Sequence, residues 1–221
     1  MFEKESWKSY DDFLMNGALD RYTKLWARYE LFKRVIDLPG DIVECGVLNG
    51  GGVLYWARLL RVFCPMAQRK VIGFDTFAGY PGSMKGEQDK KTSETFIKTT
   101  QYTGADPGQI MKTAAELGLD RWIELVEGDA TKTIKEYVQK NTGFRAALLN
   151  LDFDIYEPTL AALEAIYPVV VPQGIIVFDE YAVHQWGESK AADEFFKDKR
   201  VVLKSLSWTF SPTAYIEKEK S

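Results

Sequence analysis

Short apolar runs alternate along the chain with longer segments in which apolar positions recur at helical spacing. The runs are rich in Val, Ile and Leu, and most of them end close to an Asp, which is typical of buried strands followed by a loop. Apolar strands that alternate with helices predict an α/β fold, in which helices cover both faces of a parallel sheet. The expected strands are residues 41–47, 70–77, 123–129, 145–152 and 175–179.

Between these strands lie the expected helices. Pro39-Gly40 ends the first helical region, and Asn16-Gly17 is a candidate break within it. Residues 78–92 carry no core pattern and predict a mobile surface segment or a lid. The expected helices are residues 9–37 (one or two helices), 53–63, 93–103, 107–117, 133–141, 159–170 and 190–197, and residues 201–210 and 213–217 are expected to form two closing antiparallel strands.

Composition limits the classes of protein that fit. The 221 residues suit one domain, with residues 1–38 as an N-terminal helical cap and residues 39–221 as the ligand-binding domain. Cys45, Cys64 and the single histidine make no metal cluster, and we expect two reduced thiols. The net charge of −4 argues against a nucleic-acid partner, and no apolar run approaches a membrane span. The charged N-terminus lacks a signal-peptide core, so we expect a cytoplasmic protein without a membrane partner.

A glycine-rich turn follows the first expected strand and runs from Glu44 to Gly52. Glycines let the backbone approach a ligand closely and adopt positive φ. Their spacing does not fit a dinucleotide fingerprint, and Glu44 would repel a pyrophosphate, which opposes an NAD-binding oxidoreductase. An acid at this place suits a cationic ligand, such as the amino-acid end of S-adenosylmethionine. The candidate cofactor-binding residues of this turn are Glu44, Gly46, Gly50 and Gly51.

Acids also end the next two strands. Asp75 is expected to accept hydrogen bonds from both hydroxyls of a ribose. Asp129 is a candidate for the adenine amino group, although it also fits the N-cap of the following helix. Acids at three successive strand ends favour an adenosine-containing cofactor more strongly than any one of them alone.

A second group of acids lies further along the chain. Asp152 and Asp154 are two residues apart, so on an extended chain they face the same way. Their repulsion is relieved when a cation lies between them or one is protonated. Asp179 and Glu180 follow the next strand. Four carboxylates at the mouth of a parallel sheet predict a divalent cation, Mg²⁺ above others, while exposed loop acids are the alternative.

In order and spacing, these motifs resemble the macrocin O-methyltransferase family. The resemblance runs from about residue 25 to residue 197 and rests on residues 40–47, 74–77, 151–159 and 178–181. It implies a Rossmann-like class I methyltransferase fold, with a mostly parallel seven-stranded sheet and an antiparallel C-terminal strand pair. It also implies a metal-dependent enzyme that transfers a methyl group from S-adenosylmethionine to a sugar hydroxyl.

The resemblance further implies roles for single residues. Asp152, Asp179 and Glu180 would bind Mg²⁺ or another divalent cation, and Asp154 would be the general base. Glu180 stands where the family usually has Asp, which puts the metal geometry in question. Residues 187–190 also depart from the family pattern, which points to a different acceptor.

A metal-bound alcohol has a lowered pKa, and a nearby carboxylate can then take its proton. We expect a small sugar-like acceptor, and the sequence leaves homo-oligomer formation open. Two alternatives stay open: a metal-independent methyltransferase with His184 or Asp154 as base, and a non-catalytic nucleoside-binding protein. The aromatic candidates for stacking on a sugar ring are Tyr156, Tyr181 and Trp186.

Overall fold

The computed structural model describes residues 4–219. Residues 1–3 of the expected helical cap and residues 220–221 of the expected ligand-binding domain lie outside the described residues. Its centre is a six-stranded sheet of order β3-β2-β1-β4-β5-β6. The first five strands run parallel, and β6 pairs antiparallel with β5. The strands are β1 (Asp41–Cys45), β2 (Val71–Asp75), β3 (Ile123–Glu127), β4 (Ala146–Leu151), β5 (Val170–Phe178) and β6 (Ala214–Glu217).

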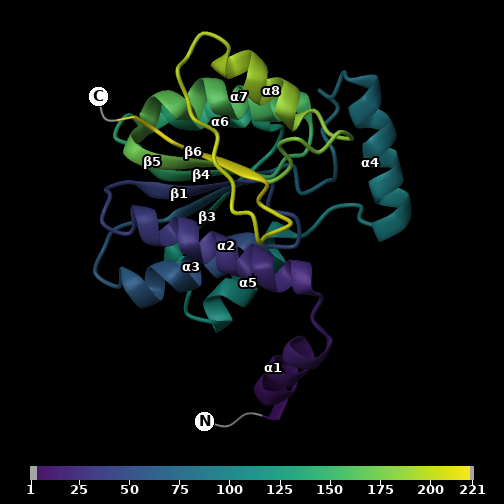
Figure 1. Ribbon diagram of the computed structural model, residues 1–221. Helices are drawn as coiled ribbons and strands as arrows, with labels where there is room; N and C mark the ends of the chain where they lie inside the picture. The colour runs from purple at the N-terminus through teal and green to yellow at the C-terminus, as the bar shows by residue number, and fades with distance from the viewer. Residues whose placement is uncertain (1–3, 220–221) are drawn as a thin grey trace.

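Helices cover both faces of the sheet, which confirms the expected fold class (Figure 1). The helices α2, α3 and α5 contribute to the core on one face, and α6, α7 and α8 to the core on the other. Helix α4 lies to one side of these layers (Figure 1). The helices are α1 (Lys4–Asn16), α2 (Leu19–Val35), α3 (Gly51–Phe63), α4 (Glu87–Thr100), α5 (Pro107–Glu116), α6 (Ala130–Lys140), α7 (Tyr156–Ile166) and α8 (Glu188–Phe196), with short 3-10 turns at Asp120–Trp122 and Tyr167–Val169.

The central strands are apolar along most of their length because both faces are buried. Ile42 and Leu148 pack toward α2 and α3, whereas Val43 and Leu149 pack toward α6 and α7. All four side chains are fully buried. Each such burial contributes roughly 1.5–3 kcal/mol, so these strands hold the two helical layers together.

The order in which the strands are added to the sheet reverses between β1 and β4. From this pair, β2 and β3 extend one way and β5 and β6 the other, which makes it the switch point where ligands bind in such sheets. Here Gly46 has a φ of +94°. A Cβ on Gly46 would lie 2.0 Å from the carbonyl oxygen of Asp152. A side chain at position 46 would therefore push the ends of β1 and β4 apart.

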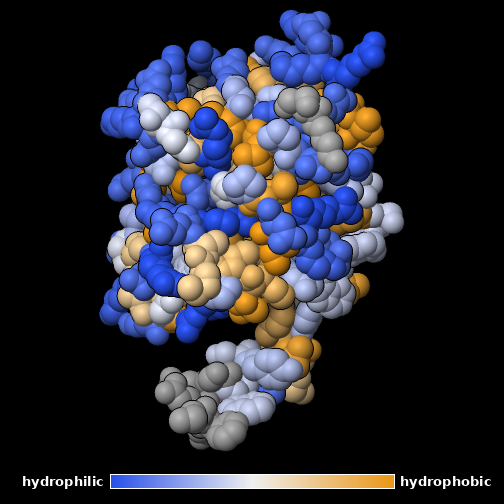
Figure 2. All heavy atoms as spheres, turned by 90° about the vertical axis from the view of Figure 1, so that its left-hand side faces the viewer, coloured by the Kyte–Doolittle hydropathy of each residue, from blue (hydrophilic) through white to orange (hydrophobic). Residues whose placement is uncertain are grey.

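Helix α1 forms a lobe beyond the start of α2 in both views (Figures 1 and 2), and its last turn, where Phe13 packs on Tyr22, contacts α2. In contrast, Leu31, Phe32 and Val35 near the end of α2 are fully buried in the core beneath the sheet. The two N-terminal helices therefore differ in how firmly they are held. Within residues 4–219, no helix is both long and apolar enough to cross a membrane.

Two expected elements differ from those observed. Residues 201–210 do not form a strand and contribute only a bridge between Lys204 and Tyr215, so the sheet has six strands and not seven. The segment pairs with β6 only at this bridge, and Val202 and Phe210 are exposed. In addition, α4 already begins at Glu87, inside the expected mobile segment, where Glu87 and Asp89 supply favourable negative charge in the first turn of the helix.

Candidate functional site

A cavity of about 990 Å³ opens at the carboxyl ends of the central strands. Its walls come from α2, the β1–α3 turn, the loops after β2, β4 and β5, and the end of α4. Gly50 and Asp129 are not part of its wall, but their neighbours Gly51 and Ala130 are. The candidate residues that line it are Glu44, Gly46, Gly51, Asp75, Asp152, Asp154, Asp179 and Glu180.

Asp75 holds the β1–α3 turn in place from the end of β2. Its Oδ2 accepts hydrogen bonds from the backbone N–H groups of Val47 (2.7 Å) and Leu48 (3.1 Å), and its Oδ1 accepts one from Phe77 (2.8 Å). Leu48 has a φ of +50°, so this turn needs such support. Asp75 organises the turn and also lines the cavity, and its contact with a ribose stays a prediction.

The glycines of the turn serve different purposes. A Cβ on Gly51 would meet no atom within 4 Å, so this position leaves the cavity wall open. A Cβ on Gly52 would lie 1.9 Å from a carboxylate oxygen of Glu44, so Gly52 is needed for packing. Gly50 has a φ of +87° and faces the side chain of Ile110. Sequence reasoning did not separate these roles because it saw only a run of glycines.

Glu44 is already paired within the protein. Its Oε1 accepts a hydrogen bond from Arg28 at 3.1 Å, and its Oε2 accepts one from the indole N–H of Trp56 at 2.6 Å. The side chain is buried, and burial raises its pKa even though Arg28 opposes the shift. Its expected contact with the cationic end of a cofactor stays a prediction.

Asp129 caps helix α6. Its Oδ1 accepts hydrogen bonds from the backbone N–H (3.0 Å) and the hydroxyl (2.7 Å) of Thr131. This is the N-cap role that the sequence allowed beside adenine binding. The neighbouring Ala130 lines the cavity, so Asp129 lies close to its wall, and the adenine contact remains a prediction.

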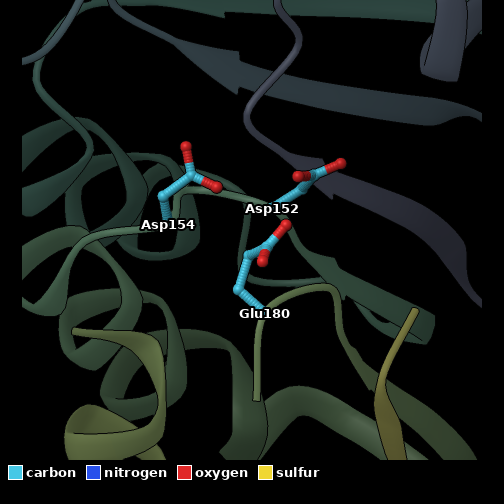
Figure 3. A group of neighbouring side chains, drawn as sticks. All are labelled: Asp152, Asp154 and Glu180. Carbon is cyan, nitrogen blue, oxygen red and sulfur yellow. The ribbon is translucent and has the colours of Figure 1, made fainter. Parts of the chain in front are cut away.

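Three carboxylates gather where β4 and β5 end (Figure 3). Asp152, Asp154 and Glu180 each place one oxygen within 4.8 Å of the others. The expected reason for this convergence was wrong, because Asp154 has a φ of +65° and the chain is not extended there. A turn after β4 brings the two aspartates together. Oxygen atoms so close together suit a hard divalent cation.

Burial and mutual repulsion make this group unfavourable when all its members are charged. Burial, followed by the charge of Asp179, raises the pKa of Asp152 to about 7 and that of Glu180 to about 8. Burial and then Asp152 raise the pKa of Asp154 well above its ordinary value. A bound divalent cation would reverse these shifts, because it favours the charged carboxylates.

Two basic residues of α2, which sequence reasoning missed, reach the same acids. The Nζ of Lys24 lies 2.7 Å from Oδ2 of Asp179 and 3.1 Å from Oδ2 of Asp152. Arg28 lies 3.3 Å from the same oxygen of Asp152. Burial alone would raise the pKa of Asp179, but these two cations lower it. The available signal was a pair of basic residues four apart on an expected helix.

Tyr80 is a second residue that sequence reasoning missed. Its hydroxyl donates a hydrogen bond to Oδ2 of Asp154 at 2.8 Å, and burial, followed by Asp154, raises its pKa. Its ring stacks on Trp186, with centroids 6.1 Å apart. In contrast, the hydroxyls of Tyr156 and Tyr181 donate to Glu194 and Asp193 of α8.

His184 is exposed and does not line the cavity. The loop that contains His184 is held by Glu188, whose side chain is fully buried. Oε1 of Glu188 accepts a hydrogen bond from the backbone N–H of Glu180 at 2.8 Å. Glu188, which belongs to the segment 187–190 that departs from the family pattern, therefore positions the loop that carries Glu180.

Hydrogen bonds attach helix α4 to the loops around the cavity. Oδ2 of Asp89 accepts a hydrogen bond from the backbone N–H of Tyr156 at 2.9 Å. The hydroxyl of Thr92 donates to the carbonyl oxygen of Gln185 at 2.9 Å. Residues near the end of α4, such as Phe96, line the cavity. These contacts hold α4 beside the cavity.

Comparisons with known proteins bear on the family and on the fold. The family model described as macrocin O-methyltransferase (TylF) matches residues 20–217. Over 150 residues the chain is 29% identical to 8-demethyl-8-(2,3-dimethoxy-alpha-L-rhamnosyl)-tetracenomycin-C 4'-O-methyltransferase of Streptomyces olivaceus, which covers 66% of this chain and 54% of that protein. Over 152 residues it is 26% identical to mycinamicin III 3''-O-methyltransferase of Micromonospora griseorubida, with 66% and 57% covered. The chain thus spans little more than half the length of these relatives.

Solved structures extend the likeness to almost the whole chain. The calicheamicin methyltransferase CalS11 is 27% identical with a TM-score of 0.74, and the match covers 96% of this chain and 85% of that one. The O-methyltransferase NovP has a TM-score of 0.76 at 23% identity and covers 90% and 80%, which supports the fold alone.

Proposed function

Since the chain belongs to the macrocin O-methyltransferase family, we propose that it transfers a methyl group from S-adenosylmethionine to a sugar hydroxyl. The acceptor would be a sugar, a sugar-containing natural product or a polysaccharide precursor, methylated in the cytoplasm. The observation that carries this proposal is the group of carboxylates on the wall of the cavity that also contains the glycine-rich turn. One relative is named for a rhamnosyl-tetracenomycin acceptor, which supports a sugar-containing acceptor here.

The donor half of the cavity suits S-adenosylmethionine. When bound, this cofactor supplies an electrophilic methyl group on its sulfonium. The open position at Gly51 leaves room for a ligand against the start of α3. Asp75 would accept hydrogen bonds from the ribose hydroxyls while it holds the turn. The proposed cofactor-binding residues are Glu44, Gly46, Gly50, Gly51, Asp75 and Asp129.

The acceptor half suits a divalent cation, Mg²⁺ or another. Asp152, Asp179 and Glu180 would hold it, because they offer only hard oxygen donors and two of them belong to the close carboxylate group. When bound, the ion supplies positive charge that lowers the pKa of an acceptor hydroxyl.

Asp154 would accept the proton from the acceptor hydroxyl. It lines the cavity beside Asp152 and Glu180, and the Tyr80 hydroxyl holds its Oδ2. A fixed carboxylate of this kind removes the proton along one direction, which favours attack on the donor methyl in line. Helix α4, fastened by Asp89 and Thr92, would exclude water from the cavity.

Purified protein with methyl-labelled S-adenosylmethionine and a panel of nucleoside-diphosphate sugars and glycosylated natural products tests this proposal. Label should pass to an acceptor, stop after exhaustive chelation and return with Mg²⁺. Undiminished transfer in chelator would support metal-independent catalysis with Asp154 as base. His184 is the weaker candidate for that base, because it is exposed away from the cavity. Cofactor binding without transfer to any acceptor would favour a nucleoside-binding protein.

A further inference from the structure

Lys24 lies between two carboxylates that the proposed function assigns to a divalent cation. Its Nζ is 2.7 Å from Oδ2 of Asp179 and 3.1 Å from Oδ2 of Asp152. We propose that Lys24 is a displaceable counter-ion: it neutralises these two acids when no divalent cation is bound and leaves them when one binds. This inference rests on the proposed function, in which both acids are metal ligands.

Lys24 is suited to movement, whereas its neighbour Arg28 is not. Arg28 is buried, binds Glu44 at 3.1 Å and lies over the ring of Trp56. The Lys24 side chain is 21% exposed and lines the cavity. A lysine ammonium on a flexible four-carbon stem can change partners more easily than a guanidinium held on several sides.

The movement needs only the side chain of Lys24. Thr23 and Ala27, near it in α2, are buried, as are Leu31 and Phe32 further along the helix. Withdrawal of the Lys24 side chain therefore leaves α2 in place.

Lys24 neutralises only part of the acidic group. Among residues 7–219, whose side chains are described, no ion pair reaches Asp154 or Glu180, although their oxygens lie within 4.8 Å of an oxygen of Asp152. A divalent cation carries twice the charge of an ammonium and accepts several oxygens at once. It can therefore neutralise Asp152 together with carboxylates that the ammonium of Lys24 does not reach.

The ammonium and a divalent cation cannot both use the same oxygens, since they would repel each other at contact distance. Lys24 therefore competes with the ion and weakens its apparent binding. Lys24 also keeps the buried Asp179 and the partly buried Asp152 neutralised before the ion arrives.

Isothermal titration calorimetry with Mn²⁺ or Mg²⁺ tests this inference in the presence of S-adenosylhomocysteine, which prevents turnover. Lys24→Met removes the competing charge and should bind the ion at least about tenfold more tightly than the unchanged protein. Lys33→Met on the same helix is the matched control. Lys33 pairs with Glu30 at 2.8 Å and does not line the cavity, so its variant should bind the ion as the unchanged protein does.

Lys24→Arg provides a second measurement, because it retains the charge and can hold both carboxylates in its fork. It should bind the ion no more tightly than the unchanged protein. Equal or weaker ion binding by a folded Lys24→Met variant would overturn the inference, and so would tighter binding by Lys24→Arg. Absence of ion binding in every variant, with cofactor binding intact, would instead show that the proposed metal dependence has failed.

Discussion

Asp154 is held in an unusual state at the scale of a single residue. Its φ of +65° lies in the left-handed region, and the Tyr80 hydroxyl donates to its Oδ2 at 2.8 Å. Burial and the charge of Asp152 raise its pKa. A carboxylate that is strained, oriented and easily protonated has the features of a general base, whereas an exposed loop acid needs none of them.

Asp154→Asn should lower kcat by roughly 10²–10⁴, because it keeps the shape and hydrogen bonding of the side chain but removes the base. Affinity for S-adenosylmethionine and for Mg²⁺ should stay nearly unchanged. Steady-state kinetics together with calorimetric titration of each ligand separates the two effects.

Asp152→Asn is the matched comparison two residues away, and it should lose affinity for the ion. If Asp154→Asn loses ion binding to the same extent, Asp154 is a metal ligand and another group must take the proton. That outcome would agree with the close approach of its oxygen to those of Asp152 and Glu180.

At the scale of single elements, β2 positions the cofactor side of the cavity through one side chain. Asp75→Ala should raise the Kd for S-adenosylmethionine about tenfold or more, since it removes the hydrogen bonds to Val47 and Leu48 and those proposed to the ribose. Calorimetry measures the change. Asp41→Ala is the control, because Asp41 also accepts a backbone hydrogen bond but lies at the start of β1, at the opposite end of the sheet.

Helix α4 provides a prediction about a lid. Asp89 is buried and accepts the backbone N–H of Tyr156, so Asp89→Ala should loosen α4 locally. Trypsin should then cleave after Lys90 and Lys91 several-fold faster, as mass spectrometry of timed digests would measure. Glu94→Ala on the exposed face of α4 should leave the cleavage rate unchanged. Equal rates in both variants would mean that Asp89 does not fasten the helix.

Over the whole molecule, the acidic site connects ion binding with stability. The pKa of Glu180 is raised from 4.5 to about 8, and that of Asp152 from 3.8 to about 7. At a pH between the ordinary pKa and the raised pKa of these groups, the folded protein binds more protons than the unfolded chain. Without a divalent cation, these two groups therefore lower the free energy of unfolding as the pH rises through this window.

Urea unfolding in chelator at about pH 5 and about pH 8 tests this effect. Relative to Glu180→Gln, the unchanged protein should lose stability as the pH rises, because the variant lacks the carboxyl group that must ionise. Mg²⁺ should bind more tightly at the higher pH, since it requires charged carboxylates. A free energy of unfolding that rises with pH relative to the variant would contradict the raised pKa of Glu180.

The layers of the fold and the meeting of the acids at one edge of the sheet could be read from the sequence. Apolar runs such as residues 146–149 are buried on both faces, so their composition alone indicates central strands of a parallel sheet. Residues at the carboxyl ends of parallel strands meet at one edge of the sheet, and therefore Asp75, Asp152 and Asp179 could be expected around one cavity. Both inferences depend only on local pattern and strand direction.

The way in which those acids are held depends on contacts between distant parts of the chain. Lys24 meets Asp152 and Asp179 across 128 and 155 residues of chain, and no local pattern records such a contact. The left-handed turn at Asp154 depends on packing and contacts from other elements, as does its hydrogen bond from Tyr80. The periodicity of apolar residues specifies which face of a helix or strand is buried. The partner of a charged side chain depends instead on which distant residues the fold brings into the same buried region.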